Sequence, residues 1–406
     1  MREIILISFL GPDQPNQFTR LMQVLSAHSL QILDVGQAVI HNQLTLGIVV
    51  ASDDQTATAL AMKEILILAH DIGLTVRFKP ISATEYDQWV KEGGRTRYIV
   101  TALAPELNAS HLQAVTQIVS AQGFNIETVT RLSGRPALNG SSTGPKRACI
   151  EFGLKGQMLD AAAMRAACLR LSSELNVDVA VQEDNAYRRN RRLVCFDMDS
   201  TLIEQEVIDE LAIEAGVGAQ VAEITERAMQ GELDFQASFR ARVALLKGMD
   251  ASVLPKIAER LTITEGAERL ISTLKALGYR TAILSGGFQY FAEYLQGKLD
   301  IDEVHANALD VQDGVVTGEV KGHIVDGARK ALLLGEIAKE MGISLEQTIA
   351  VGDGANDLPM LSIAGLGVAF RAKPLVRQNA TQAISSVGLD GVLYLLGVHD
   401  KDLNQA

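Results

Sequence analysis

Apolar residues recur along the first part of the chain with the spacings of short helices and strands. Intervals of three and four residues predict helices, and β-branched runs bounded by polar turns predict strands. Together they give the order βαββαβ. The elements are strand 3–11, helix 17–30, strands 31–41 and 44–52, helix 57–73 and strand 75–82.

The same order of elements recurs in the following stretch, so the pattern indicates an internal repeat. The two copies align without gaps around their first helices, where Ser26-Ala27 falls on Ser120-Ala121, 94 positions later. A fixed repeat of one supersecondary unit is typical of tandem modules. We therefore predict two α+β modules with a ferredoxin-like βαββαβ order, at 1–85 and 95–184.

From Leu193 onward the pattern changes to apolar runs that alternate with amphipathic stretches. This alternation favours a parallel sheet covered by helices on both faces, hence an α/β fold. A mostly helical insertion at about 206–265 separates the first two strands and is long enough to form a cap. We predict a Rossmann-like parallel sheet with a helical cap over 192–400. Its strand-like runs are 192–197, 280–287, 303–311, 347–354 and 365–370.

Composition and charge narrow the class of protein. A chain of 406 residues exceeds one ordinary domain, and 47% hydrophobic residues supply material for several cores. The net charge of −12 argues against nucleic acid or an anionic membrane as a partner. A cluster of four arginines within 188–192 is short and lies in an acidic chain, so we expect a solvated linker there.

Three further features indicate a soluble, cytoplasmic protein. The apolar run at the N-terminus is short and has no small-residue cleavage site, so it does not resemble a signal peptide. No apolar stretch reaches the roughly 18 residues of a membrane span. The three cysteines are too scattered for a disulfide framework, and we expect them to be buried apolar filler.

The candidate chemistry lies where the strands of the predicted sheet end. Ligands of such sheets bind at the carboxyl ends of the strands. Asp197 and Asp199 are two residues apart on extended chain, so they point to the same side, and Asp353 would complete an oxygen-rich site suited to Mg²⁺. Each motif alone is common in ordinary turns, but their joint occurrence at successive strand ends favours a phosphate site. The donors facing a phosphate would be Ser285, Gly286 and Lys330.

These motifs resemble those of a known enzyme superfamily. "FDMDSTL", "LSGG", the lysine and "GDGAND" are similar, in order, to the four motifs of the haloacid-dehalogenase-like hydrolases. Within that superfamily the match is to the phosphoserine phosphatase family, from Arg192 to the C-terminal region. The repeated modules resemble ACT domains, whose turn Gly-x-Asp-x-Pro-Gly is matched by 11–16 except that Asn16 replaces the last glycine.

The resemblance assigns roles to individual residues. Asp197 would be the nucleophile that forms an aspartyl-phosphate, and Asp199 the general acid and base. Mg²⁺ would be held by Asp197, the backbone carbonyl of Asp199 and Asp353, with Asp357 close behind. The phosphoryl group would be bound by Ser285, Gly286, Lys330 and Asn356.

The resemblance also implies a substrate, O-phospho-L-serine, hydrolysed to L-serine in the final step of L-serine biosynthesis. Glu206 would bind its ammonium group and Arg242 its carboxylate, while Met229 and Phe235 close over the site. Arg240 is expected to point away. The ACT-like modules suggest an amino-acid effector and a homodimer. Two alternatives remain: another small-molecule phosphatase or phosphotransferase of the superfamily, and an amino-acid-responsive regulatory protein.

Overall fold

The structure is a computed structural model that describes residues 2–92, 97–136, 146–230 and 232–403. The chain divides into two compact units, residues 1–95 and 96–406. Within the described ranges, none of the helices combines the length and the apolar composition that crossing a membrane requires.

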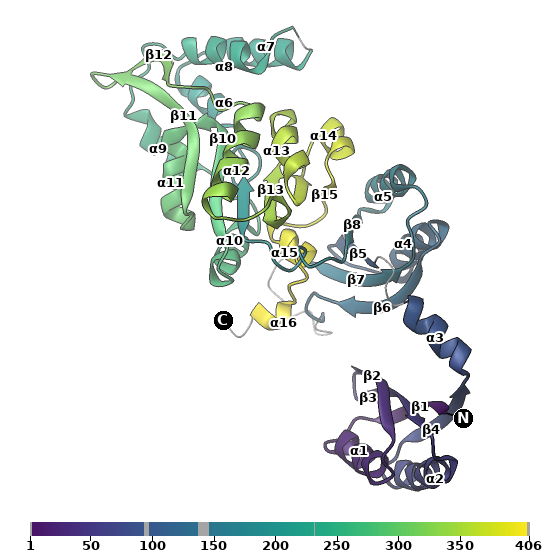
Figure 1. The fold of residues 1–406 in the computed structure, drawn as a ribbon. Helices are drawn as coiled ribbons and strands as arrows, with labels where there is room; N and C mark the ends of the chain where they lie inside the picture. Colours follow the sequence, from purple (N-terminus) through teal and green to yellow (C-terminus); the bar gives the residue numbers. More distant parts are fainter. Residues whose placement is uncertain (1, 93–96, 137–145, 231, 404–406) are drawn as a thin grey trace. The chain divides into compact units, whose positions relative to one another are not determined.

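The first unit is a four-stranded antiparallel sheet packed against two helices (Figure 1). Its strand order is β2-β3-β1-β4, as the βαββαβ pattern predicts. Alternate residues of the strands and one face of each helix form the main buried core, and a smaller buried cluster contains Ile4, Val49 and Ala51. The elements are β1 (Glu3–Pro12), α1 (Gln17–Ala27), β2 (Gln31–Ile40), β3 (Gln43–Ser52), α2 (Gln55–Asp71) and β4 (Thr75–Ile81).

A further helix, α3 (Ala83–Glu92), follows the sheet and is not predicted by the hydrophobic spacing. Its start carries a local signal. The Ser82 backbone N–H donates to Glu85 Oε2 at 2.8 Å, and the Glu85 N–H donates to Ser82 Oγ at 3.2 Å. This reciprocal capping box stabilises the first turn of a helix that has little apolar surface to bury.

The turn after β1 explains how Asn replaces the glycine of the ACT motif. Asn16 has a φ of 67°, in the left-handed region that asparagine tolerates better than most residues. Gly11 is more constrained, because a Cβ there would lie 2.6 Å from the Gly73 carbonyl oxygen. The turn therefore keeps its backbone shape, but it carries an asparagine side chain at the position where the motif has glycine.

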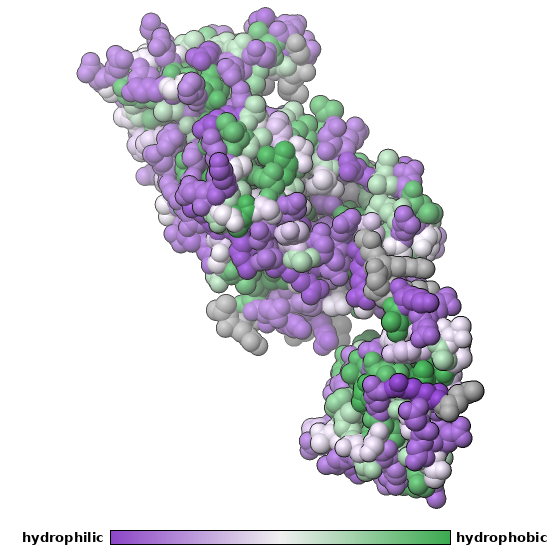
Figure 2. Space-filling model, viewed as in Figure 1, coloured by the Kyte–Doolittle hydropathy of each residue, from purple (hydrophilic) through white to green (hydrophobic). Residues whose placement is uncertain are grey.

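The edge strand β2 of this unit leaves apolar side chains exposed. Figure 2 shows hydrophobic surface among hydrophilic surface on the part formed by the first 92 residues. Ile40 is 77% exposed, which is high for an apolar residue within a strand. The other exposed apolar residues of β2 are Ile32, Val35 and Val39. An exposed apolar edge is a common site of strand pairing or association.

The second unit begins with a module of the same βαββαβ order. Its sheet has the order β6-β7-β5-β8, which corresponds strand for strand to the first unit. A separate core lies between this sheet and its two helices. The elements are β5 (Arg97–Ala104), α4 (Ala109–Ala121), β6 (Asn125–Arg131), β7 (Ala148–Lys155), α5 (Ala161–Leu175) and β8 (Asp178–Glu183).

The rest of this unit is built on a seven-stranded sheet of order β12-β11-β10-β9-β13-β14-β15. Apolar layers cover both faces, as a doubly wound α/β fold requires. The strands are β9 (Leu193–Phe196), β10 (Arg280–Phe288), β11 (Glu303–Gln312), β12 (Val315–Lys321), β13 (Thr348–Gly352), β14 (Leu366–Phe370) and β15 (Gln382–Ile384). The main helices around it are α10 (Ala267–Ala276), α11 (Gln289–Leu299), α12 (Gly327–Glu340), α13 (Leu358–Ile363) and α14 (Pro374–Asn379).

The predicted parallel sheet is confirmed, with two additional strands, and one of them, β15, pairs in parallel with β14. β12 pairs antiparallel with β11 at the sheet edge, and the sequence pattern does not predict it. The β11–β12 hairpin contacts the helical insertion, where the Gly248 N–H donates to the Val316 carbonyl at 2.9 Å. The insertion forms the helices α6 (Val207–Glu214), α7 (Gly218–Met229), α8 (Phe235–Ala244) and α9 (Val253–Arg260). In Figure 1, α7 and α8 lie together at one end of this unit, beside β12.

The expectation of a solvated arginine linker is wrong for two of the four arginines. Arg188 is 1% exposed and forms an ion pair with Glu151 of the second module. Arg191 is 5% exposed and donates to the Gly365 carbonyl at 3.3 Å. These side chains bury their long stems while their guanidinium groups find partners. The segment thus anchors the second module to the sheet.

Candidate active site

Asp197 follows directly after β9, a four-residue strand whose side chains are all buried. β9 pairs in parallel with β10 on one side and β13 on the other. The Asp197 N–H extends this pairing by donating to the Val351 carbonyl at 2.9 Å. Asp197 is 5% exposed, and its Oδ1 accepts a hydrogen bond from the Met198 N–H at 2.8 Å. The carboxylate is therefore rigidly placed at the centre of the sheet's carboxyl edge.

Lys330 reaches this carboxylate from the first turn of α12. Its side chain is fully buried, and its Nζ lies 2.7 Å from Asp197 Oδ1 and 2.6 Å from Asp357 Oδ1. Burial alone would lower the pKa of Lys330, but the two carboxylates raise it above its ordinary value. The lysine therefore stays charged and compensates part of the negative charge around it.

Asp197, Asp353 and Asp357 form a carboxylate cluster in the part of the chain that the structure describes. One oxygen of each lies within 4.8 Å of the others. The Gly354 N–H donates to Asp357 Oδ2 at 2.9 Å and fixes its direction. Three carboxylates with one buried ammonium leave an excess of negative charge on hard oxygen ligands. These donors suit a divalent cation such as Mg²⁺.

Burial raises the pKa values of two of these carboxyl groups, those of Asp197 and Asp353. For Asp197, burial is the largest cause and Asp357 adds to it, while Lys330 opposes the rise. For Asp353, burial followed by the charges of Asp357 and Glu206 raises the pKa to about 7. Like charges in a poorly solvated site favour protonation until a cation compensates them.

The turn Ser285-Gly286-Gly287 lies inside β10, at its carboxyl end, rather than after the strand. Ser285 is fully buried, and its Oγ accepts a hydrogen bond from the Gly287 N–H at 2.9 Å. A Cβ at position 287 would lie 2.6 Å from Asp199 Oδ2. The glycine therefore lets the backbone approach the carboxylate closely.

Asn307 is a buried residue of β11 that sequence reasoning missed. It is 2% exposed, and its Nδ2 donates to the Gly286 carbonyl at 2.8 Å. Its Oδ1 accepts from the Val325 N–H at 2.8 Å, so the amide joins two segments that border the site. The sequence signal for this linking role is one polar asparagine within a strand-like run.

Asp199 lies on the side of the site that faces the cap. Its Oδ1 accepts a long hydrogen bond from the Val207 N–H at 3.4 Å. Burial, followed by the negative charge of Glu206, raises its pKa well above the ordinary value. A protonated carboxyl group is thereby favoured at this position, as a general acid requires.

Glu206 and Arg242 are two charged groups of the cap segment. Glu206 accepts a hydrogen bond from Ser200 Oγ at 2.9 Å, and Ser200 has a φ of 55° in the left-handed region. Arg242 is half-buried, and its Nε is buried without a hydrogen-bond partner among the described residues. Burial lowers the pKa of Arg242, while Glu206, Asp209 and Asp199 oppose this. An acidic and a basic group thus face the same site.

Phe235 and Asn356 lie close to the Gly286 backbone. A Cβ at Gly286 would lie 2.8 Å from Phe235 Cζ and 3.6 Å from Asn356 Nδ2. Phe235 also stacks on Phe239 of the same helix, with ring centroids 6.1 Å apart. The phenyl ring therefore covers the turn that ends β10 and limits the access of water.

Three further residues belong to the cap helices, and two of them were considered in the sequence analysis. The third, Gln236, was not identified from the sequence. Its Nε2 donates to Asp326 Oδ2 at 2.6 Å and so links α8 to the N-cap residue of α12. Arg240 is exposed. The side chain of Met229 lies outside the described residues.

Comparison with known proteins shows what the chain is similar to. Residues 194–362 match the haloacid dehalogenase-like hydrolase family, and residues 3–79 match the ACT domain family. The phosphoserine phosphatase SerB2 of Mycobacterium tuberculosis is 39% identical over 404 residues, covering 99% of this chain and 95% of that protein. The phosphoserine phosphatase of Streptomyces coelicolor is 40% identical over 408 residues, with coverage of 99% and 94%.

Solved structures show the same likeness. A probable phosphoserine phosphatase from Vibrio cholerae, in unliganded form, has a TM-score of 0.59 at 34% identity and covers 77% of this chain and 90% of its own. A haloacid dehalogenase family hydrolase from Salmonella enterica serovar Typhi has a TM-score of 0.64 at 31% identity, with coverage of 73% and 98%.

Proposed function

This chain belongs to the phosphoserine phosphatase family of the haloacid dehalogenase-like hydrolases, and we propose that it hydrolyses O-phospho-L-serine to L-serine and phosphate. The observation that carries this proposal is the contact of Asp197 with Lys330 at the carboxyl edge of the sheet, with Asp199 beside it. A carboxylate nucleophile, a neighbouring acid and a buried cation are the groups that phosphoryl transfer through an aspartyl-phosphate needs.

In the first step, a carboxylate oxygen of Asp197 attacks the phosphorus, and the bond from phosphorus to the seryl oxygen breaks. Asp199 donates its proton to that oxygen, which leaves as the hydroxyl group of L-serine. The raised pKa of Asp199 supports this role, since its protonated form is favoured before the substrate reacts.

In the second step, water attacks the phosphorus of the aspartyl-phosphate and Asp199 removes a proton from it. The bond between phosphorus and Asp197 breaks, so phosphate leaves and the carboxylate is restored. The Ser285 hydroxyl, the Gly286 N–H and the Lys330 ammonium would bind the phosphoryl oxygens, with Asn356 orienting them. Phe235 would keep other water away from the intermediate.

Asp197, Asp353 and Asp357 fit a divalent cation, which we propose is Mg²⁺. A backbone carbonyl from Asp199 would add a fourth protein oxygen. When bound, the cation supplies positive charge that compensates the phosphoryl oxygens and the carboxylates. Lys330 compensates the same carboxylates from the buried side, so the two cations share the negative charge of the site.

Selection of phosphoserine would depend on Glu206 and Arg242. A carboxylate for the ammonium group and a guanidinium for the carboxylate match the two charges that phosphoserine carries besides its phosphate. The unpartnered Nε of Arg242 is consistent with a group that awaits an anionic partner. Sugar phosphates carry neither charge and would lose both contacts.

The test is phosphate release from O-phospho-L-serine, with and without Mg²⁺, by the protein and its Asp197→Asn variant. We expect metal-dependent release that the substitution abolishes. Absence of release from any phosphoester by folded protein with Mg²⁺ would contradict the proposal and favour a regulatory protein on the same fold.

Substrate choice is tested separately with Arg242→Lys and Glu206→Gln. We expect KM for phosphoserine to rise at least tenfold in each, since a charged contact of the substrate is weakened or lost. The matched control is Arg240→Lys, an exposed residue of the same helix. Equal rates on phosphoserine and a sugar phosphate would instead favour a broader small-molecule phosphatase.

We further propose that the first ACT-like module binds an amino-acid effector and that the protein is a homodimer. The match to the ACT domain family supports the first point, and the exposed apolar strand β2 supports association. Serine titrations and sedimentation would test both. The Asn16→Gly variant restores the motif glycine, so we expect it to bind serine more tightly than the parent.

A further inference from the structure

A cavity of about 220 Å³ lies where the second βαββαβ module meets the sheet domain. One wall is formed by α5 and β8, and the other by α14 and β15. These elements lie side by side in Figure 1. None of the lining residues belongs to the site around Asp197. The cavity therefore needs a separate explanation.

Arg377 points a partly unpaired guanidinium at this cavity. Its Nη2 donates to Ser172 Oγ at 2.8 Å, but its Nε is buried without a hydrogen-bond partner in the described part of the chain. Arg165 lines the same cavity from α5. Neither arginine forms an ion pair with any described residue. A buried donor of this kind is costly unless something accepts from it.

The acidic and amide groups of the cavity are already used. Asp178 is 1% exposed, and its Oδ2 accepts from the Ser385 and Ser386 N–H groups, both at 2.6 Å. Its Oδ1 accepts from Ser172 Oγ at 2.8 Å. The Gln382 amide exchanges two hydrogen bonds with the backbone of Val181. Cationic donors therefore remain available in this cavity, whereas its carboxylate does not.

The remaining lining is apolar and sets the size of a ligand. Met164, Leu169 and Val179 are among the side chains that complete the wall. The volume corresponds to about seven water molecules at ~30 Å³ each, which is space for a molecule of about eight heavy atoms. Burial raises the pKa of the Cys168 thiol to about 11, so it is neutral and offers no nucleophile.

We propose that this cavity binds a small branched aliphatic carboxylate that carries no ammonium group, with Arg377 as its principal anchor. The carboxylate would accept from the terminal nitrogens of the guanidinium, where Nη1 and the second N–H of Nη2 can donate two parallel hydrogen bonds. The aliphatic part would fill the apolar wall. An ammonium group would find no free carboxylate there, so the corresponding amino acid should bind more weakly. This proposal goes beyond the phosphatase function and does not depend on it.

The test is isothermal titration of the full chain with 3-methyl-2-oxobutanoate and, in a second arm, with L-valine. The two probes share a carbon skeleton and differ in the ammonium group. We expect the oxo acid to bind with a Kd on the order of 1 mM, as its small size implies, and valine to bind at least tenfold more weakly. Inorganic phosphate serves as an anion without an aliphatic part, and we expect no binding that depends on Arg377.

Three variants locate the binding. Arg377→Met removes the guanidinium and should weaken binding of the oxo acid at least tenfold, while Arg377→Lys, which keeps the charge, should restore part of it. Arg170→Met alters an exposed arginine of α5 outside the cavity and should change nothing. The melting temperature of each variant shows that it is folded. Oxo-acid binding that survives Arg377→Met undiminished, or no binding up to about 10 mM, would overturn the proposal.

Discussion

The ammonium group of Lys330 lies 2.7 Å from Oδ1 of Asp197, and neither group has appreciable access to solvent. A buried charge of this kind must be compensated by its neighbours because water cannot do so. Asp357 is the second neighbour, at 2.6 Å. Removing the lysine would leave two buried carboxylates without the cation that they share.

We therefore expect Lys330→Met to impair both catalysis and stability. Loss of the positive charge beside the reacting phosphoryl group should lower kcat by roughly a hundred- to a thousand-fold. Breaking a buried ion pair from one side should reduce the free energy of unfolding by about 3–5 kcal/mol. Steady-state kinetics at saturating Mg²⁺ and chemical denaturation would measure the two effects.

The matched control is Lys339→Met, which removes an exposed lysine from the same helix. It should leave kcat unchanged and stability within about 0.5 kcal/mol. A Lys330→Met protein with normal kcat would contradict the role of this lysine in phosphoryl transfer.

Gly287 gives a prediction that depends on backbone space alone. A Cβ at this position would lie 2.6 Å from Asp199 Oδ2 and 2.8 Å from Met198 Cε, closer than atoms can approach. We expect Gly287→Ala to displace the Asp199 carboxylate and lower kcat at least a hundred-fold, since proton transfer requires hydrogen-bond distance. Presteady-state release of serine would report the first step directly.

Gly297→Ala provides the control, because a Cβ there meets no atom within 4 Å and the residue lies within α11. Alanine favours the helix over glycine, so this variant should be as stable as the parent or more stable by up to about 1 kcal/mol. An active Gly287→Ala enzyme would show that the close approach is not required.

The proposed catalytic groups could be predicted from the sequence because each stands next to a strand or helix end. Parallel strands end at one edge of the sheet, so Asp197, Ser285 and Asp353 converge once the strands are recognised. Their proximity follows from the pairing of neighbouring parallel strands. The internal repeat likewise predicts two modules, because one βαββαβ pattern recurs with the same polarity of helices and strands.

The residues that sequence reasoning missed are placed by contacts between distant segments. Asn307 joins the turn at Gly286 to Val325, and Gln236 joins the cap to Asp326. Arg188 looks like a solvated charge until Glu151 is brought beside it. No local spacing encodes these pairs, since their partners lie between 18 and 90 residues away.

The pKa of Asp353 gives a prediction about metal binding. In the metal-free protein, burial, Asp357 and Glu206 raise this pKa to about 7. A carboxylate must be deprotonated to bind a cation, so below pH 7 each bound Mg²⁺ should displace a proton from Asp353, in addition to any proton that the raised pKa of Asp197 retains there. We expect the Kd for Mg²⁺ to fall by up to about tenfold per pH unit from pH 5.5 to 7 and then to level off. Titration calorimetry in buffers of different ionisation enthalpy would count the protons.

The same shift fixes the sign of a stability effect. Between about pH 4 and pH 7 the Asp353 carboxyl group binds more protons in the folded metal-free protein than in the unfolded chain. The free energy of unfolding that this group contributes therefore falls as the pH rises through that range. Saturating Mg²⁺ should remove this decrease of the free energy of unfolding with pH. A metal affinity that is independent of pH between 5.5 and 7 would contradict the raised pKa.

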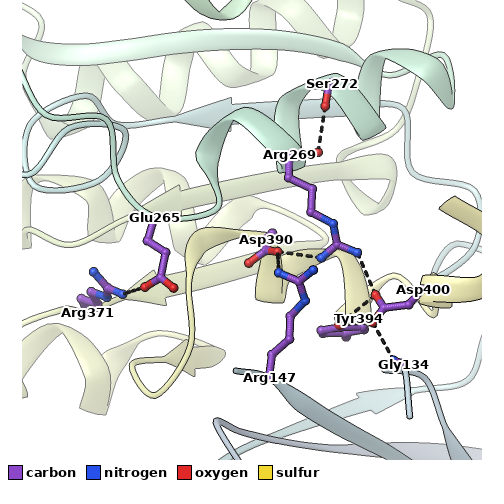
Figure 3. A network of polar contacts seen from close by, with 9 residues as sticks. All are labelled: Gly134, Arg147, Glu265, Arg269, Ser272, Arg371, Asp390, Tyr394 and Asp400. Atoms are coloured by element: carbon purple, nitrogen blue, oxygen red, sulfur yellow. Dashed lines mark hydrogen bonds and ion pairs between the residues drawn. The ribbon is translucent and has the colours of Figure 1, made fainter. Parts of the chain in front are cut away.

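An ion-pair network ties the second module to the end of the chain (Figure 3). Asp390 is 2% exposed and accepts from Arg147, which precedes β7, at 2.5 Å and from Arg269 of α10 at 2.6 Å. Arg269 also donates to Asp400 Oδ1 at 2.7 Å, and the Gly134 N–H donates to Asp400 Oδ2 at 2.7 Å. The network therefore joins the module to the sheet domain through two carboxylates.

Asp400 makes this junction sensitive to acid. Burial would raise its pKa, but the hydrogen bonds from Gly134, Arg269 and Tyr394 hold the pKa below its ordinary value. The stabilisation is thus present above about pH 4 and is lost as the pH falls through the lower pKa of the folded protein. Asp400→Asn should lower the melting temperature at pH 7 by about 2 °C, a difference that shrinks below pH 4. Asp402→Asn, at an exposed neighbour, should show no difference at either pH, and a constant deficit for Asp400→Asn across the range would exclude the charge as its cause.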